Sequence, residues 1–289
     1  MDNFVRTLYQ ERASQPSTLG VLLIENTDQL LATTDTFDLI IFIISTDEEK
    51  DLYLKHYYYE EKKLALYMVN NKKLNEWLMA GSNRRIYDWL LNGKILFDRN
   101  DFVHQLIQDL KDFPFHERKL KIGLEFAKLI RRYTDGKKLY EQKHLFDAYN
   151  HVIHSLHHLA RLSLIEKGFQ PEVTVWDQVK SIEPEIYKVY EELINSGEPL
   201  KKRLDLLFLA SEFFIHMRTD LGSSHLLEVL DKKLKWSIQD IVEEEELKLY
   251  SIDIFALLEY LVDKGFLHIV LEESKGKKIY HRYYTTKNI

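Results

Sequence analysis

The sequence predicts a multidomain α+β protein with three successive parts, and three observations carry that prediction. Over residues 1–116, short apolar runs alternate with short amphipathic stretches, which is typical of a small α/β domain. Residues 117–222 have long helical periods and predict an all-α helical bundle. Residues 223–289 contain two short helical patterns followed by two strand patterns. A chain of 289 residues is long for one core, so several domains are expected.

The best-defined element of the first part is the apolar run at residues 39–44, which no polar residue interrupts. Its length and β-branched content are those of a strand buried on both faces in the middle of a sheet. Charges at helical spacing predict a helix over residues 46–55, with Asp47 as its N-cap. The other expected elements are a helix at 3–13, strands at 19–24, 63–69 and 95–97, a helix at 71–79 and a further helix after Gly81.

The middle part is expected to be a bundle of helices separated by glycine and proline signals. Thr134, Asp135 and Gly136 are expected to break the first helix from the second, and Gly168 is expected to end the second. The expected helices cover residues 117–133, 138–167, 184–193 and 200–217.

The last part has the order of a winged helix-turn-helix domain, with helices at 238–247 and 251–264 and a hairpin at 266–285. Its second helix carries Asp253, Glu259 and Asp263 against a single lysine, which does not suit the major groove of DNA. The hairpin is basic and can contact a phosphate backbone. Two roles stay open, namely nucleic-acid binding through the hairpin and packing or homodimerisation. The basic hairpin residues are Lys275, Lys277, Lys278 and Arg282.

Composition narrows the class of protein. The residues are 45% hydrophobic and 30% charged, as in a soluble globular protein, and the net charge of -6 does not indicate a nucleic-acid or membrane partner for the whole molecule. The absence of cysteine excludes disulfides, thiolate metal sites and a cysteine nucleophile, and it fits a reducing cytoplasm. No secretory signal is expected at the amino terminus, and no apolar run approaches the ~20 residues of a membrane span.

Two carboxylates precede the central strand, Asp35 and Asp38. A carboxylate at the start of a buried strand is held rigidly, as a Mg²⁺ ligand must be in phosphoryl chemistry. The alternative is that both are turn residues, which hydrogen-bond the nearby backbone before the strand begins.

The three-part order resembles the nucleotidyltransferase superfamily, and in particular bacterial nucleotidyltransferase-like proteins that have a trailing helix-turn-helix part. The resemblance covers the whole chain. The segments that carry it are residues 35–39, residues 80–85 with Trp89 after them, and residues 93–99.

The resemblance implies a degenerate metal site. Active members have a Gly-Ser pair for the nucleotide phosphates, an acidic pair one residue apart and a third carboxylate on a later strand, which together hold two Mg²⁺ ions. Here Gly20 is followed by valine instead of serine, and the two positions of the acidic pair hold Thr36 and Asp38. The strand expected at 63–69 has no carboxylate. Asp35 is displaced by one position, so on a strand it would face away from Thr36. Asp38 is left as the residual catalytic and metal candidate, and Mg²⁺ is implied only for an active enzyme.

Phosphate-binding candidates are Arg84 and Arg85, because guanidinium groups match phosphate geometry. The segment Gly81, Ser82 and Asn83 joins them, because backbone amides just before a helix can bind an anion. Gly20 joins them as the position where the resemblance implies the Gly-Ser pair for the nucleotide phosphates. The alternative is a solvated arginine pair at a helix start.

Histidines on one predicted helix are the unusual feature of the bundle. His151, His154 and His158 lie at i, i+3 and i+7, which places them on one stripe. Such imidazoles can bind zinc, act as acid and base, contact a substrate or simply pack. The resemblance makes the bundle a substrate-binding part. The main hypothesis is therefore a nucleotide or small substrate bound between the α/β domain and the bundle, with Asp35, Thr36 and the histidines in the cleft. The alternatives are a nucleic-acid-binding regulator and an active Mg²⁺-dependent transferase acting on a hydroxyl.

Overall fold

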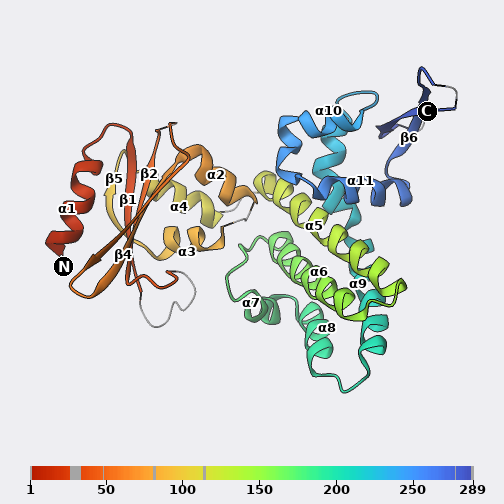
Figure 1. Cartoon of the computed structure of the whole chain (residues 1–289), viewed down its shortest axis with the longest axis horizontal. Coiled ribbons are helices and arrows are strands. Elements are labelled where there is room, and N and C mark those ends of the chain that lie inside the picture. Colours follow the sequence, from red (N-terminus) through yellow and green to blue (C-terminus); the bar gives the residue numbers. More distant parts are fainter. Residues whose placement is uncertain are drawn as a thin grey trace. The chain divides into compact units, whose positions relative to one another are not determined.

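The computed structural model describes residues 2–26, 34–47, 49–80, 83–112, 115–276 and 278–287. The chain divides into two compact units, Met1–Pro114 and Phe115–Ile289, and each is described by itself (Figure 1).

The first unit is built on a five-stranded sheet with the order β3-β4-β2-β1-β5. The central strand β2 pairs antiparallel with β1 and parallel with β4. All seven residues of β2 are buried, which confirms the prediction of a central strand covered on both faces. The strands are β1 (Thr18–Glu25), β2 (Leu39–Ser45), β3 (Leu52–Tyr59), β4 (Lys62–Asn70) and β5 (Lys94–Asp98).

Helices cover both faces of this sheet (Figure 1). Helix α1 (Asp2–Ala13) packs on the face that Leu39 and Ile41 of β2 share, and the other helices pack on the face of Ile40 and Phe42. The alternation of β2 side chains thus supplies two separate cores, one on each side of the sheet. The helices on the second face are α2 (Asn71–Ala80), α3 (Arg84–Asn92) and α4 (Phe102–Asp112).

The helix predicted over residues 46–55 is wrong, because β3 begins at Leu52 and continues to Tyr59. Within β3 the tyrosines at 53, 57 and 59 are half-buried while their neighbours are exposed, which is the period of an edge strand. Pairing with β4 along its whole length outweighs the helical spacing of the charges. The Asp47 carboxylate accepts a hydrogen bond from the Glu49 amide (3.0 Å), so it closes a turn instead of capping a helix.

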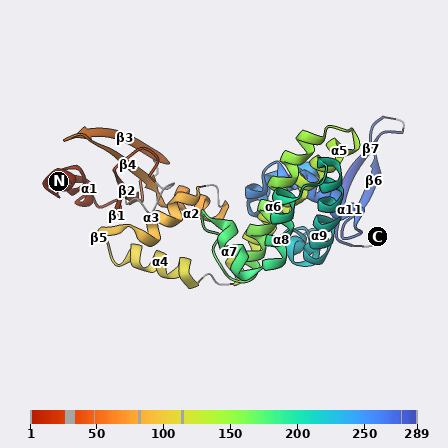
Figure 2. The ribbon, with the colours of Figure 1, turned by 90° about the horizontal axis from the view of Figure 1, so that it is seen from below.

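The second unit is a helical bundle that continues into two short helical elements, a helix and a hairpin (Figures 1 and 2). The helix, helix, hairpin order of its last part confirms the predicted winged helix-turn-helix arrangement. Trp236 is buried, and its backbone pairs with that of Tyr284, so the second hairpin strand is held to the segment that follows the bundle. The elements are α5 (Phe115–Glu141), α6 (Leu145–Glu166), α7 (Val175–Ile182), α8 (Pro184–Asn195), α9 (Leu200–Leu230), α10 (Ile238–Glu243), the 3₁₀ helix η1 (Glu245–Tyr250), α11 (Asp253–Asp263), β6 (His268–Glu273) and β7 (Tyr280–Thr285).

Two predicted helix ends in the bundle are wrong, and in both cases a glycine packs inside a helix. Helix α5 runs through Gly136, where an added Cβ would lie 3.0 Å from the Cβ of His151 on α6. Helix α9 runs through Gly222, where an added Cβ would lie 2.3 Å from the Phe126 ring of α5. Close helix packing therefore explains both glycines. The predicted domain boundary after Gly222 falls inside α9, and the domain limits stay a prediction.

Within the described ranges, no helix combines the length and the apolar character that crossing a membrane requires.

Candidate functional site

The segment before β2 is a turn rather than a strand. The Phe37 amide donates to the Thr34 carbonyl (3.1 Å), and Asp35 has a φ of 55°, in the left-handed region that aspartate tolerates. The expectation that Asp35 and Thr36 point to opposite sides of a strand is therefore wrong. Both residues are exposed, so a ligand at this end of the sheet can reach them.

Asp38 joins the starts of neighbouring strands. Its Oδ2 accepts a hydrogen bond from the Lys63 amide (2.8 Å), and its own amide donates to the Lys63 carbonyl (2.9 Å). Its carbonyl accepts from the Asn26 amide (2.9 Å). One carboxylate oxygen of the residual metal candidate thus already has a backbone partner.

Asp35 forms an ion pair with Arg85, which lies in the first turn of α3. Burial raises the pKa of the Tyr67 hydroxyl of β4, the charge of Asp35 raises this pKa further, and the charge of Arg85 opposes the rise. The Tyr67 ring meets Trp89 of α3 edge to face, with centroids 5.0 Å apart. We call Asp35, Tyr67, Arg85 and Trp89 the β2-mouth cluster. The Arg85 side chain is 42% exposed, and its guanidinium can bind a phosphate oxygen.

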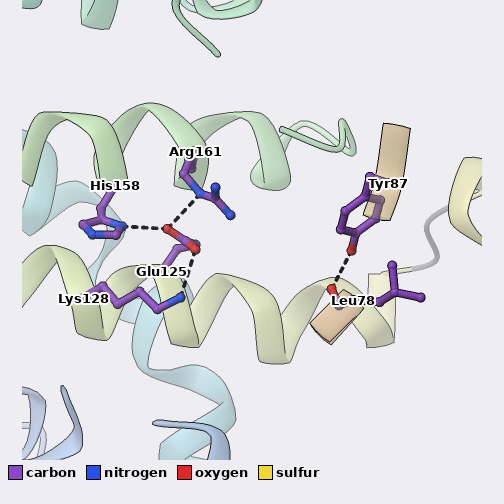
Figure 3. Close-up of polar contacts among 6 residues, drawn as sticks. All are labelled: Leu78, Tyr87, Glu125, Lys128, His158 and Arg161. Atoms are coloured by element: carbon purple, nitrogen blue, oxygen red, sulfur yellow. Dashed lines mark hydrogen bonds and ion pairs between the residues drawn. The ribbon is translucent and has the colours of Figure 1, made fainter. Parts of the chain in front are cut away.

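The loop between α2 and α3 carries the rest of the predicted phosphate site. The Tyr87 hydroxyl of α3 donates to the Leu78 carbonyl of α2, which ties the two helices together (Figure 3). Gly81, Ser82 and the side chain of Arg84 lie outside the described residues. Asn83 precedes α3 without a side-chain capping bond.

Gly20 lies inside β1, beside the first turn of α4. A Cβ at this position would lie 2.1 Å from Cγ2 of Val103, so the glycine lets α4 approach the sheet closely. Its role in binding phosphate stays a prediction.

Among the residues that the structure describes, those at the mouth of β2 do not fit a two-metal site. Thr36 offers a hydroxyl in place of a carboxylate, β4 has no carboxylate, and Asp35 is paired with Arg85. Mg²⁺ needs several oxygen ligands at fixed positions, and one free oxygen of Asp38 does not supply them.

One group of three potential metal ligands occurs elsewhere in the described residues, at Asp98, Asp101 and His104. The Asp98 carboxylate accepts hydrogen bonds from the amides of Val103 (2.8 Å) and His104 (3.1 Å). It therefore caps the start of α4. The neighbouring Arg99 donates to the carbonyls of Thr18 (2.7 Å) and Gln15 (2.9 Å) and so holds the start of β1.

In the second unit, the histidine stripe of α6 faces a carboxylate from another helix. Nδ1 of His158 lies 2.9 Å from Oε2 of Glu125 on α5 (Figure 3). His151 is half-buried, and its Nδ1 has no hydrogen-bond partner in the described part of the chain, while His154 is exposed. The sequence offered no carboxylate among the histidines because Glu125 comes from a different helix.

Glu125 is buried and surrounded by cations. Nε of Arg161 lies 3.2 Å from its carboxylate and Nζ of Lys128 lies 3.3 Å from it (Figure 3). Burial alone would raise the pKa of Glu125, but Arg161, His158 and Lys128 together hold it well below its usual range. Glu125 was not among the residues predicted from the sequence, although a single acid within an apolar stretch of α5 is a signal for a buried ion pair.

Positive charge extends along the contact between α5 and α6. Partial burial lowers the pKa of His154, and the neighbouring Arg132, His158 and His151 lower it further. Glu125 contacts two permanent cations, Lys128 and Arg161, and Arg132 lies farther along the helices near His154. This excess of cations over one carboxylate favours binding of an anion. We call this the α5–α6 seam; its members are Glu125, Lys128, Arg132, His151, His154, His158 and Arg161.

In the helix-turn-helix part, the side chains expected to contact nucleic acid are only partly available. Arg282 of β7 donates to the Glu259 carboxylate of α11 (2.8 Å), and the Tyr284 hydroxyl donates to the same group (3.1 Å). Lys275 and Lys278 are exposed, and Lys277 lies outside the described residues.

Comparisons with known proteins agree with this architecture. Three family models match successive parts of the chain, described as nucleotidyltransferase-like (residues 1–118), YgxA-like substrate binding domain (119–218) and helix-turn-helix domain (224–286). The fold and its parts thus define a nucleotidyltransferase-like protein with an attached substrate-binding domain and helix-turn-helix domain.

Two relatives match over almost the whole length. The Bacillus subtilis protein YgxA, which is described as uncharacterized, is 47% identical over 287 residues, covering 99% of this chain and 98% of that protein. The crystal structure of a nucleotidyltransferase-like protein from Exiguobacterium sibiricum superimposes with a TM-score of 0.84 at 36% identity and covers 99% of each chain. The chain belongs to the YgxA-like family of nucleotidyltransferase-like proteins.

Proposed function

We propose that this protein is a cytoplasmic, nucleotidyltransferase-like protein with a degenerate metal site, which binds a nucleotide or another phosphate-bearing small molecule without transferring a nucleotidyl group. The observation that carries the proposal is the hydrogen bonding of the Asp38 carboxylate. Its carboxylate accepts the Lys63 amide at 2.8 Å, while Thr36 and β4 supply no second or third carboxylate. Two-metal transfer needs carboxylates that converge on the ions.

Two features support binding of a phosphate. The Arg85 guanidinium is held at the mouth of β2 by Asp35 and is still partly exposed. In the other unit, the α5–α6 seam carries a surplus of positive charge, and it lies in the part that matches a substrate-binding domain. Arginine is well suited to this role because its planar group donates two parallel hydrogen bonds to phosphate. That one ligand contacts both units stays a prediction.

Calorimetric titration of the full chain with a panel of nucleotides, with and without Mg²⁺, tests this function. We expect saturable binding. The affinity should fall at least about tenfold in Arg85→Ala or Arg132→Ala, since a hydrogen bond to a charged group contributes about 1.5–3 kcal/mol. Arg6→Ala, at an exposed position on α1, is the matched control and should bind as the wild type does. No binding at millimolar nucleotide would exclude the proposal. Pyrophosphate release that Asp38→Ala abolishes would indicate an active Mg²⁺-dependent transferase instead.

A second candidate function is nucleic-acid binding through the carboxy-terminal part, which the match to a helix-turn-helix domain favours. Helix α11 carries Asp253, Glu259 and Asp263, so the basic hairpin is the surface that suits a phosphate backbone. Binding to random duplex DNA should weaken as salt rises and should weaken further in the Lys275→Ala, Lys278→Ala double variant. Binding that is absent, or that ignores salt, would remove this candidate.

A further inference from the structure

Helix α9 is apolar on two opposite faces. Its inner face packs into the second unit through a regular series of buried residues. On the outer face, four consecutive positions of the helical stripe are large apolar side chains that remain 55–70% exposed: Leu206, Leu209, Phe213 and Met217. A helix that is apolar all round normally lies inside a protein or an assembly. The buried inner residues include Leu204, Leu207, Phe208, Ser211, Ile215 and Thr219.

The outer stripe has charged ends of opposite sign. Lys202 lies four residues before Leu206 and precedes the stripe on the same side of the helix. Asp220 lies three residues after Met217 and ends the stripe. Lys202 pairs with Glu198 of its own chain (2.8 Å), but that pair is exposed and therefore weak. The Asp220 carboxylate is exposed and has no hydrogen bond or ion pair to any other described residue.

We propose that the outer face of α9 binds the same face of a second copy of this chain, with the two helices antiparallel. A symmetric pair brings each face against itself. In a parallel pair, Lys202 would face a second Lys202, and Asp220 a second Asp220. In the antiparallel pair, each lysine faces an aspartate, so the charge pattern selects that direction.

The same register also pairs the apolar residues. When Lys202 lies opposite the second copy's Asp220, Leu209 lies opposite the second copy's Phe213, and Leu206 lies opposite the second copy's His216 and its neighbour Met217. Leu209 and Phe213 thus face each other directly, and Leu206 and Met217 are offset by one residue at the three-and-four spacing of antiparallel helix pairs. Phenylalanine at the centre of such a contact contributes a large buried area.

A pocket of about 290 Å³ lies between α8 and α9, next to the stripe, and Leu206 and Ala210 form part of its wall. The flexible side chain of Met217 from the second copy suits such a space, because methionine adapts to irregular gaps. The pocket therefore extends the contact beyond one pair of helices.

Sedimentation velocity of the full chain over a range of concentrations tests the proposal. We expect a reversible dimer that Leu209→Lys or Phe213→Lys weakens by about thirtyfold or more, as for a central residue of an interface. Leu234→Lys is the matched control, since Leu234 is 60% exposed outside the stripe, and it should leave the dimer intact. A monomer at all concentrations overturns the proposal, and so does a dimer that both stripe variants leave unchanged.

Charge reversal tests the direction of the helices. Lys202→Asp and Asp220→Lys should each weaken the dimer, and the double variant should restore it. Because the wild-type chain has no cysteine, introduced thiols give a second test. Oxidation of mixed Leu209→Cys and Phe213→Cys chains should form the mixed covalent dimer faster than either variant forms its own. Preferential self-crosslinking of Leu209→Cys would show a parallel pair and overturn the antiparallel assignment.

Discussion

The Lys63 amide donates a hydrogen bond to the Asp38 carboxylate at 2.8 Å, so the side chain expected to hold a metal joins the start of β2 to the start of β4. The same two residues are also linked in the other direction, from the Asp38 amide to the Lys63 carbonyl. This pairing aligns the two parallel strands at their first residues. Asp38 therefore has a structural role in this chain, although the family takes its name from nucleotidyl transfer.

Replacing Asp38 should loosen the strand start. Asp38→Ala is expected to lower the free energy of unfolding by about 1 kcal/mol, because it leaves the Lys63 amide without its acceptor. Hydrogen exchange of the Lys63 amide should speed up in the same variant. Asp38→Asn keeps an acceptor oxygen and is the control, with an effect of less than half that size. Unchanged exchange at Lys63 in Asp38→Ala would contradict the structural role.

Removing the buried carboxylate of the second unit should be far more costly. Glu125→Ala leaves Arg161, which is 6% exposed, with an uncompensated buried charge, and we expect a loss of about 3–5 kcal/mol in urea unfolding. Glu191→Ala, at an exposed position on α8, should change stability by less than about 0.5 kcal/mol. The double variant Glu125→Leu, Arg161→Met should be more stable than Glu125→Ala. If Glu125→Ala were as stable as the wild type, the ion pair between Glu125 and Arg161 would not stabilise the fold.

The same carboxylate predicts a dependence of stability on acid. The folded pKa of Glu125 is lower than its ordinary value of 4.5, so the unfolded chain takes up the proton first as pH falls. Stability from this group is fully present above about pH 4.5 and is lost as pH falls from there towards the folded pKa. Urea unfolding of the wild type between pH 6 and 3 should therefore show a steeper decline than Glu125→Gln. Parallel curves for the two proteins would contradict the assignment.

Arg132 should control the titration of His154. Partial burial and the cations of the α5–α6 seam hold the pKa of His154 below its ordinary value of 6.5. Arg132→Gln removes one of these cations, so the His154 pKa should rise, as measured by NMR titration of the imidazole protons. Binding of a phosphate-bearing ligand at the seam should raise it too, because an anion stabilises the imidazolium. Arg6→Gln is the control, and a His154 pKa that Arg132→Gln leaves unchanged would refute the coupling.

Two glycine-to-alanine substitutions should differ in their effect on stability. Alanine forms helices better than glycine by about 1 kcal/mol, but Gly222→Ala places a methyl group 2.3 Å from the Phe126 ring. Overpacking of this kind costs about 1–3 kcal/mol, so thermal unfolding should begin at a lower temperature. Gly197 has no atom within 4 Å of an added Cβ, and Gly197→Ala should be neutral or slightly stabilising. A stabilised Gly222→Ala protein would show that α5 and α9 can move apart.

The sequence by itself determined the central strand, the three-part order and the candidate residues at the mouth of β2. An uninterrupted apolar run rich in β-branched residues is typical of a strand in the middle of a sheet that is covered on both faces, and β2 lies there. The sequence also has Thr36 where the resemblance implies a second carboxylate, and that difference is visible without any structure.

Only the tertiary structure decided what the remaining residues do. Edge pairing turned residues 52–59 into β3, and close packing of helices kept Gly136 and Gly222 inside α5 and α9. Glu125 meets His158 from 33 residues away, so no local pattern links them. The partner of Asp38 was hidden for the same reason: hydrogen bonds and ion pairs between elements depend on register and packing, which arise only when distant segments fold together.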